Sequence, residues 1–214
     1  MNNIKLKLEN ISKSFFLKKV FENLSYEFTP GCYAIVGSNG AGKSTLLSIM
    51  SGSISSDSGF ISINDINLTK HSVKAKRHIS YVTDEVLVYP FMTGKELLKF
   101  ICAAKKSEIS SETEKLLTGF NIHDFMHVCF SEMSLGTQRK FLLAASTISN
   151  PDIYIFDEPT NAIEQSSREF FINYLLGIKD KKIIIFSTHD KELINCLNAK
   201  ELRLEKHPIH QLIS

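Results

Sequence analysis

The stretch Gly37-Ser38-Asn39-Gly40-Ala41-Gly42-Lys43-Ser44 decides the fold of this chain. It matches the pattern G-x-x-x-x-G-K-[ST], which binds phosphate when it follows a strand and opens a helix. Both neighbours are predicted here, because residues 33–36 form an apolar run and apolar residues with helical spacing continue up to Gly52. A chance match in a chain of this length has a probability on the order of one in a hundred. We therefore predict a phosphate-binding loop between a buried strand and a helix.

Each residue type in this loop has a chemical role. Backbone N–H groups of the glycine-rich turn can point at phosphate oxygens, and the N-terminus of the following helix adds positive potential. Lys43 is expected to reach the terminal phosphates of a bound nucleotide, while the hydroxyl of Ser44 can bind Mg²⁺. The predicted nucleotide-binding residues of the loop are Gly37, Ser38, Asn39, Gly40, Ala41, Gly42, Lys43, Ser44 and Thr45.

Two acidic residues follow a second apolar run, residues 153–156. Parallel sheets bind ligands at the C-terminal ends of their strands, so we expect Asp157 and Glu158 at that edge. Asp157 would orient Mg²⁺ or its water shell. Glu158, expected to point away from Asp157 on an extended backbone, can activate the water that attacks the γ-phosphate. A solvated strand end is the alternative, but the phosphate loop favours the metal site because it needs an acidic partner.

Apolar periodicity divides the chain into a β-rich first part and a later α/β part. Residues 4–8 alternate between apolar and charged side chains, which predicts a half-buried strand. Helical spacing predicts an insertion at about 86–135. The apolar runs 153–156 and 183–186 enclose a helical stretch, as a parallel sheet buried on both faces requires. Alternation around 202–204 predicts an edge strand.

Composition limits the classes of partner. The 214 residues carry 25 basic and 23 acidic side chains, a net charge of +2, so we expect no nucleic acid as a partner. The four cysteines lack the paired spacing of a zinc site. The apolar runs are far below the roughly 20 residues of a membrane-spanning helix, and the N-terminus does not have the pattern of a secretory signal. We expect a single cytoplasmic domain over residues 1–214.

Three further segments resemble one known family, the ATP-binding subunits of ABC transporters. Residues 134–137, Ser-Leu-Gly-Thr, resemble its signature motif and lie just upstream of the acidic strand. Residues 157–164 resemble its Walker B motif followed by its D-loop. Residues 186–190 resemble its histidine switch, with His189 as the switch residue.

A fourth segment, residues 8–15, resembles the part of the family that carries the aromatic side chain on which adenine stacks. We assign this role to Phe15, and Phe16 is the competing choice. With this segment the resemblance runs from residue 8 to residue 190 in the family's motif order. It implies an α/β fold: a P-loop ATPase core with a mainly parallel sheet, an N-terminal antiparallel β subdomain and a helical insertion.

The resemblance implies that two subunits complete each ATP site, as a homodimer or with a paired ATP-binding subunit. Glu158 and His189 would be catalytic, and Ser44 and Asp157 would hold the metal. The hydroxyl of Ser134 and a backbone N–H of the signature helix would reach the γ-phosphate on the other subunit. The predicted signature residues are Ser134, Leu135, Gly136 and Thr137.

The resemblance also implies a membrane partner. Such a subunit energises a multi-subunit transporter, interpreted here as an exporter, and would lie on the inner face of the cell membrane through an integral membrane permease. Residues 86–92 resemble the surface on which the permease docks, with ordinary core packing as the alternative. A second hypothesis is a soluble ABC-type ATPase acting on a ribosome, nucleic acid or assembly machine. A P-loop kinase or GTPase is disfavoured by the signature and the switch histidine.

The sequence departs from the family pattern at several positions. Asp84 stands where the family has its Q-loop glutamine, and an ionised carboxylate can only accept hydrogen bonds, although it could ligate Mg²⁺. Leu135 and Thr137 replace the commonest signature residues, and Glu164 ends the D-loop. Because the loop lysine, the acidic pair and the switch histidine all remain, we expect ATP hydrolysis.

Overall fold

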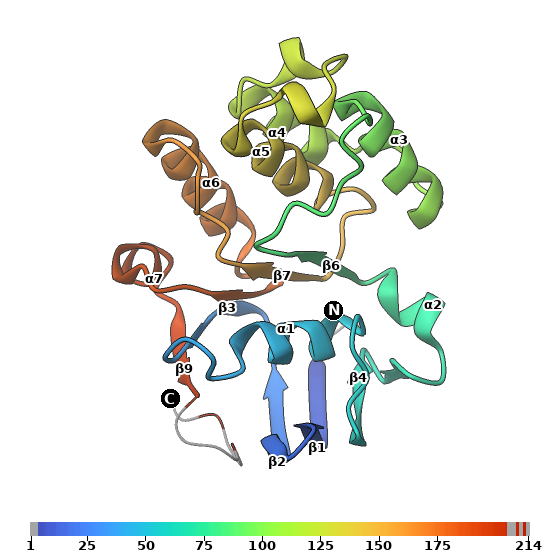
Figure 1. Cartoon of the computed structure of the whole chain (residues 1–214), viewed down its shortest axis with the longest axis vertical. Helices are drawn as coiled ribbons and strands as arrows, with labels where there is room; N and C mark the ends of the chain where they lie inside the picture. Colours follow the sequence, from blue (N-terminus) through green and yellow to red (C-terminus); the bar gives the residue numbers. More distant parts are fainter. Residues whose placement is uncertain (1–3, 205–208, 210–211, 213–214) are drawn as a thin grey trace.

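The computed structural model describes residues 4–204, 209 and 212, and it contains two sheets with helices packed against them (Figure 1). One sheet is antiparallel and comes from the N-terminal part of the chain, whereas the other is parallel. The predicted α/β fold, with a mainly parallel sheet and an N-terminal antiparallel β subdomain, is confirmed. The two ends of the predicted domain, residues 1–3 and 213–214, lie outside the described residues.

The antiparallel sheet follows the alternation of apolar and charged residues that the sequence shows. Leu6 and Leu8 are buried while Lys7 between them is exposed, because successive side chains of a strand point to opposite faces. One face of the sheet is therefore packed and the other is solvated. In spatial order its strands are β2 (Lys18–Phe28), β1 (Leu6–Phe15), β4 (Ser58–Ile63) and β5 (Ile66–Asn67).

The parallel sheet is buried on both faces at its centre. Every residue of its strands β7 (Ile153–Asp157) and β8 (Ile183–Ser187) is buried, which is why both segments contain continuous apolar runs. Ile155 packs with the N-terminal β-subdomain, whereas its neighbour Phe156 packs with the helices of the opposite face. The predicted edge strand is present as β9. In spatial order the strands are β6 (Ile79–Val82), β7 (Ile153–Asp157), β8 (Ile183–Ser187), β3 (Gly31–Val36) and β9 (Lys200–Arg203).

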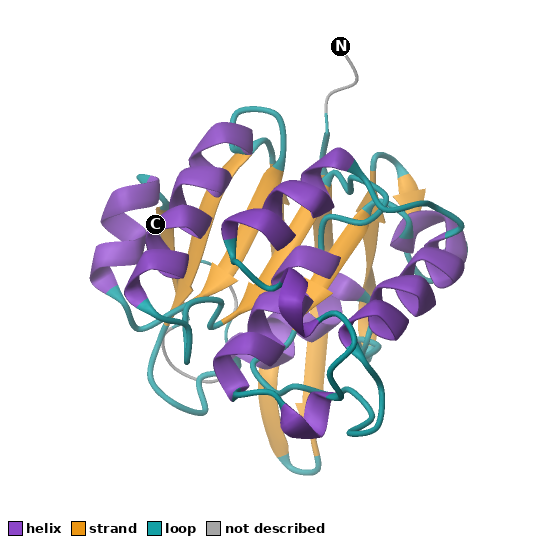
Figure 2. Cartoon of the chain, turned by 90° about the horizontal axis from the view of Figure 1, so that it is seen from above, coloured by secondary structure: helices purple, strands orange, loops and turns teal. Residues whose placement is uncertain are grey.

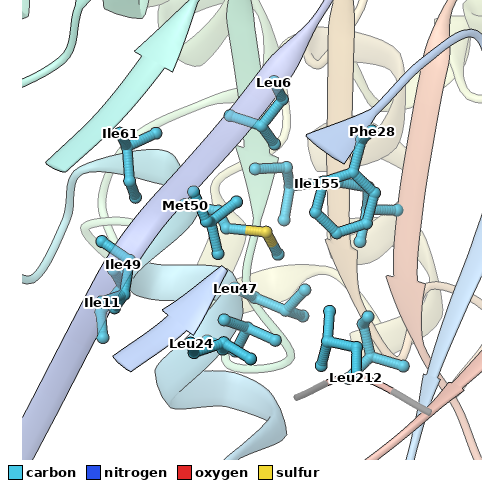
Figure 3. Close-up of a cluster of buried hydrophobic side chains, with 14 of the residues drawn as sticks. Leu6, Ile11, Leu24, Phe28, Leu47, Ile49, Met50, Ile61, Ile155 and Leu212 are labelled. Carbon is cyan, nitrogen blue, oxygen red and sulfur yellow. The ribbon is translucent and has the colours of Figure 1, made fainter. Parts of the chain in front are cut away.

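Helix α1 (Lys43–Ser51) lies between the two sheets (Figure 1). Its apolar residues, among them Leu47 and Met50, are fully buried and belong to one cluster with Leu6 of β1 and Ile155 of β7 (Figure 3). Burial of apolar surface on two sides fixes the helix, since each fully buried Leu or Met contributes about 1.5–3 kcal/mol. The phosphate loop at its N-terminus is thereby held against the parallel sheet.

The remaining helices cover the other face of the parallel sheet and its edges, as the view from above shows (Figure 2). Helix α3 begins with a capping box, in which Thr93 and Glu96 exchange side-chain and backbone hydrogen bonds. Helices α3, α4 and α5 pack together within and beyond the predicted insertion, in the upper part of Figure 1. The helices are α2 (Ser72–Lys76), α3 (Gly94–Lys105), α4 (Ser111–Gly119), α5 (Leu135–Ala145), α6 (Gln165–Ile178) and α7 (Lys191–Leu197), with 3-10 turns at His123–Phe125 and Phe130–Glu132.

Within the described residues, no helix combines the length and the apolar character that crossing a membrane requires.

We predict that Phe171→Ala lowers the free energy of unfolding by about 3–5 kcal/mol, because it empties a well-packed aromatic site. Phe171 is 0% exposed, and its ring contacts those of Phe120, Phe156 and Tyr174. Urea unfolding followed by circular dichroism measures the change. Phe100→Ala is the matched control: its side chain is 63% exposed, so a shift within about 0.5 kcal/mol is expected. Equal losses in the two variants would contradict this account of the core.

Candidate functional site

A cleft of about 630 Å³ lies where the phosphate loop meets the C-terminal ends of the parallel strands. It brings together residues that are far apart in the sequence, from the first hairpin to the strand end at His189. Most of the predicted nucleotide, metal and catalytic residues are among them. The cleft is lined by Phe15, Lys18, Val20, Asn39, Gly40, Gly42, Lys43, Ser44, Thr45, Asp84, Asp157, Glu158, Asn161 and His189.

Gly42 shows why the loop needs glycine at the start of the helix. Its φ is 102°, a backbone conformation that side-chain-bearing residues rarely adopt. A Cβ at this position would also lie 2.8 Å from Cγ1 of Val20 in the N-terminal hairpin. The glycine therefore allows both the turn and its close approach to β2, and α1 begins at the next residue, Lys43.

The Lys43 ammonium group is buried within the loop. Its Nζ donates hydrogen bonds to the backbone carbonyls of Gly37, at 2.9 Å, and Ser38, at 3.4 Å. Nζ also lies 3.1 Å from Nε2 of His189. Because an ammonium group can only donate, Lys43 is the donor in this contact. The loop lysine and the predicted switch histidine are thus in direct contact.

Asp157 ends β7 and is buried at the bottom of the cleft. The hydroxyl of Ser187, at the end of β8, donates to its carboxylate and accepts a hydrogen bond from the backbone N–H of Glu158 at 3.0 Å. Ser44 lines the same cleft, so a hydroxyl and a carboxylate oxygen are available together. Hard oxygen ligands of this kind, completed by phosphate oxygens and water, suit Mg²⁺. The residues present fit that ion.

Glu158 does not have the extended backbone that we predicted. Its φ is 48°, in the left-handed region, because the chain turns sharply from β7 into the segment that begins with Pro159. Its carboxylate still faces the cleft, with Oε1 3.8 Å from Nε2 of His189. Burial raises the pKa of the Glu158 carboxyl, and the neighbouring His189 and Lys43 oppose that shift. A raised pKa makes a carboxylate a stronger proton acceptor.

The two candidate aromatic residues are placed differently. Phe15 lines the cleft and is 44% exposed, and Nζ of Lys13 lies 5.3 Å from its ring centroid. Phe16 lies at the tip of the hairpin with a φ of 51° and is fully exposed. Lys13 is itself held by Asp57 through a 2.8 Å ion pair. Of the two, Phe15 is the one that lines the cleft, and its stacking role stays a prediction.

Asp84 lines the cleft from the loop after β6, opposite the acidic strand end. Its carboxylate Oδ1 lies 3.2 Å from Nη1 of Arg139 and accepts a hydrogen bond from Nδ2 of Asn161 at 3.3 Å. Asn161 lies within the D-loop match at 157–164, but neither partner was predicted as a site residue. Arg139 follows the signature as one of several polar residues on a helix, and no pattern in the sequence marks it.

The four signature residues lie outside the described lining of this cleft. Ser134 caps α5, and its hydroxyl accepts a hydrogen bond from the backbone N–H of Thr137 at 3.2 Å. Leu135 is exposed. Gly136 packs so closely on the D-loop that a Cβ there would lie 2.5 Å from the backbone oxygen of Ala162. That these residues contact ATP bound to another subunit stays a prediction.

Comparisons with known proteins identify relatives for nearly the whole chain. The family model described as ABC transporter matches residues 21–161. An uncharacterised ABC transporter ATP-binding protein of Methanocaldococcus jannaschii is 32% identical over 207 residues, or 94% of this chain and 74% of that protein. The linearmycin resistance ATP-binding protein LnrL of Bacillus subtilis is 28% identical over 197 residues, 90% of this chain and 63% of that protein. The chain spans 43% of a further relative, the uncharacterised ABC transporter ATP-binding protein YkpA of the same bacterium.

Solved structures share the fold. The ATP-binding subunit of an ABC transporter superposes with a TM-score of 0.86 at 23% identity, covering 98% of this chain and 88% of that one. A dimeric ATP-binding cassette in a post-hydrolysis state gives a TM-score of 0.82 at 22% identity and covers 98% of both chains. Since the family model matches more than half of the sequence, this chain belongs to the ABC transporter family as an ATP-binding subunit with an ABC-type ATPase domain.

Proposed function

We propose that this chain hydrolyses ATP to energise a multi-subunit membrane exporter, and that ATP-driven pairing of two such subunits is the coupled step. The observation that carries the proposal is the cleft in which Lys43, Ser44, Asp157, Glu158 and His189 meet. These residue types supply phosphate binding, metal binding, a proton acceptor and a hydrogen-bonding imidazole in one place.

The proposed mechanism assigns each group a separate task. Lys43 and the N–H groups at the start of α1 hold the terminal phosphates, where a cation and a helix N-terminus act together. Mg²⁺, held through Ser44 and Asp157, would neutralise charge that develops on the phosphate oxygens. Glu158 orients the attacking water and accepts its proton, while His189 donates a hydrogen bond to the γ-phosphate.

Pairing of subunits is supported by the placement of the signature. Ser134 and Gly136 open helix α5 outside the described lining of the chain's own cleft, so their N-terminal N–H groups can serve a second subunit. A similar cassette is described as dimeric and bound to ADP and Pi. We propose a homodimer or a pair with a related ATP-binding subunit.

A permease-docking surface is supported by exposed apolar side chains between β6 and α3. Leu87, Tyr89 and Phe91 are all exposed, and the rings of Tyr89 and Phe91 stack with centroids 5.4 Å apart. Exposed apolar side chains gathered in this way are typical of interaction sites. The proposed location is the inner face of the cell membrane, reached through that permease. The export direction is carried over from the sequence expectation, because the relatives include both a linearmycin resistance ATP-binding protein and a molybdate/tungstate import ATP-binding protein.

We predict that Glu158→Gln lowers the rate of ATP hydrolysis at least about 100-fold, because a positioned general base contributes roughly that much. ATP binding should persist, and an ATP-bound dimer should accumulate in size-exclusion chromatography. The control is Glu169→Gln, an exposed carboxylate on α6, which should hydrolyse ATP at the wild-type rate. Turnover that survives in Glu158→Gln would remove Glu158 from the role of base.

We predict that Phe15→Ala weakens ATP binding by about 1–3 kcal/mol, the usual contribution of one aromatic stack on a base. Phe16→Ala is the matched control, because the same side chain is removed one residue away where it is fully exposed. Isothermal titration with Mg²⁺ and ATP measures both. If Phe16→Ala gives the larger loss, the assignment of the stacking residue is reversed.

We predict that the double substitution Tyr89→Asp and Phe91→Asp releases the chain from the membrane fraction of its own cells. Two charges would face the apolar surface of the permease, while the hydrolysis rate of the purified chain should stay unchanged because neither residue lines the ATP cleft. Sedimentation of a tagged chain measures the effect, with Glu169→Gln as control. A wild-type chain that never sediments with membranes would favour the soluble alternative.

A further inference from the structure

The backbone at Glu158 is unusual for a residue with a side chain. Its φ of 48° lies in the left-handed region, which side-chain-bearing residues seldom occupy. The next residue is Pro159, and a following proline restricts the backbone further towards extended conformations. A conformation of this kind persists only where surrounding contacts hold it, and such residues cluster at functional sites.

Contacts on both sides hold this backbone. On the amide side, the N–H of Glu158 donates to the hydroxyl of Ser187 on β8 at 3.0 Å. On the carbonyl side, Glu158 O accepts hydrogen bonds from Nη2 of Arg139 at 2.6 Å and from the N–H of Asn161 at 3.2 Å. The contact from Arg139 is the one that comes from the signature helix α5.

The guanidinium group of Arg139 is enclosed, with the residue only 4% exposed. Its Nη1 contacts both the backbone oxygen and the carboxylate of Asp84, the latter at 3.2 Å. A buried charge is costly unless it is paired, and Asp84 is its ion-pair partner among the described residues. The planar fork of arginine suits this task because separate nitrogens can bind Asp84 and Glu158 at the same time.

Other contacts seat α5 on the segment that follows Glu158. The ammonium of Lys140, next to Arg139 in the sequence, pairs with the carboxylate of Glu164. Near the start of the helix, Gly136 approaches the backbone of Ala162 more closely than a side chain would allow. Helix α5 is therefore fixed to both ends and to the middle of this segment, and Arg139 is its contact with the proposed base.

We propose that Arg139 is a positioning residue for ATP hydrolysis: it fixes the left-handed backbone of Glu158, and Asp84 is the counter-ion that keeps its guanidinium in place. The proposal rests on Glu158 being the base of the proposed function. It gives the aspartate at the Q-loop position a role through Arg139 rather than as a metal ligand. It also connects the base directly to the helix whose first residues form the signature.

The first test compares Arg139→Met, Arg139→Lys and Lys105→Met in the purified full chain. We expect kcat of Arg139→Met to fall at least tenfold with KM for ATP unchanged, and Arg139→Lys to recover part of the loss, since lysine can reach one partner. Lys105→Met is the matched control: Nζ of Lys105 also donates to backbone carbonyls, those of Lys76 and Ile79, away from the cleft. An unchanged kcat, a change in KM alone, or an equal loss in the control would overturn the proposal.

The second test removes the counter-ion and also serves if Arg139→Met does not fold. Asp84→Ala should lower kcat several-fold, and raising the Mg²⁺ concentration should not restore it. Recovery at high Mg²⁺ would make Asp84 a metal ligand and overturn its role as counter-ion. In the double variant Arg139→Met and Asp84→Ala, the loss of kcat should be smaller than the product of the two single losses. A loss equal to that product would overturn the coupling between Asp84 and Arg139.

Glu158→Gln, measured beside these variants, distinguishes a failure of the proposed function from a failure of the positioning role. If that variant still hydrolyses ATP, the proposed function fails at its base. If it is inactive while Arg139→Met and Asp84→Ala turn over at the wild-type rate, only the positioning role fails.

Discussion

The parallel hydrogen-bond register of β3, β8 and β7 is the constraint on which the site depends. Asp157 pairs with Ser187, and Ser187 pairs with Ile35, so the three strands end at one edge of the sheet. The phosphate loop follows β3, the acidic pair begins with the last residue of β7, and His189 lies two residues after β8. A slip of one residue would exchange the side chains that face the two packed layers, such as Ile155 and Phe156, so packing on both faces fixes the register.

That alignment concentrates charge in a partly enclosed space. Asp157 and Glu158 are adjacent carboxylates, and Lys43 and His189 lie beside them. Burial raises the pKa of Glu158, and the Ser187 hydroxyl donates a hydrogen bond to the Asp157 carboxylate. Asp157 and Glu158 thus have different surroundings although they are adjacent. Such a difference allows one carboxylate to act as the proposed proton acceptor and the other as the proposed metal ligand.

The sequence predicted the parts of this molecule that depend on local pattern. The buried strands, the turn at Gly42 and the acidic strand end follow from periodicity, loop chemistry and chain order. The choice between Phe15 and Phe16 depended on how the hairpin turns, and the left-handed backbone of Glu158 depends on contacts from β8 and α5. Such features arise from tertiary packing, which local propensity does not contain.

The contact between Arg139 and Asp84 also depends on tertiary packing and could not be predicted from the sequence. In the sequence, Asp84 is a departure from a family pattern, and Arg139 is one of several polar residues on a helix. In the fold the two residues form an ion pair. The buried guanidinium needs a neighbouring negative charge, and the ionised carboxylate needs a hydrogen-bond donor because it can only accept hydrogen bonds. The substitution at the Q-loop position is therefore understood only with its partner on α5. Because that helix also begins with the signature, the residues proposed to contact another subunit and the residue proposed to hold the base belong to one helix.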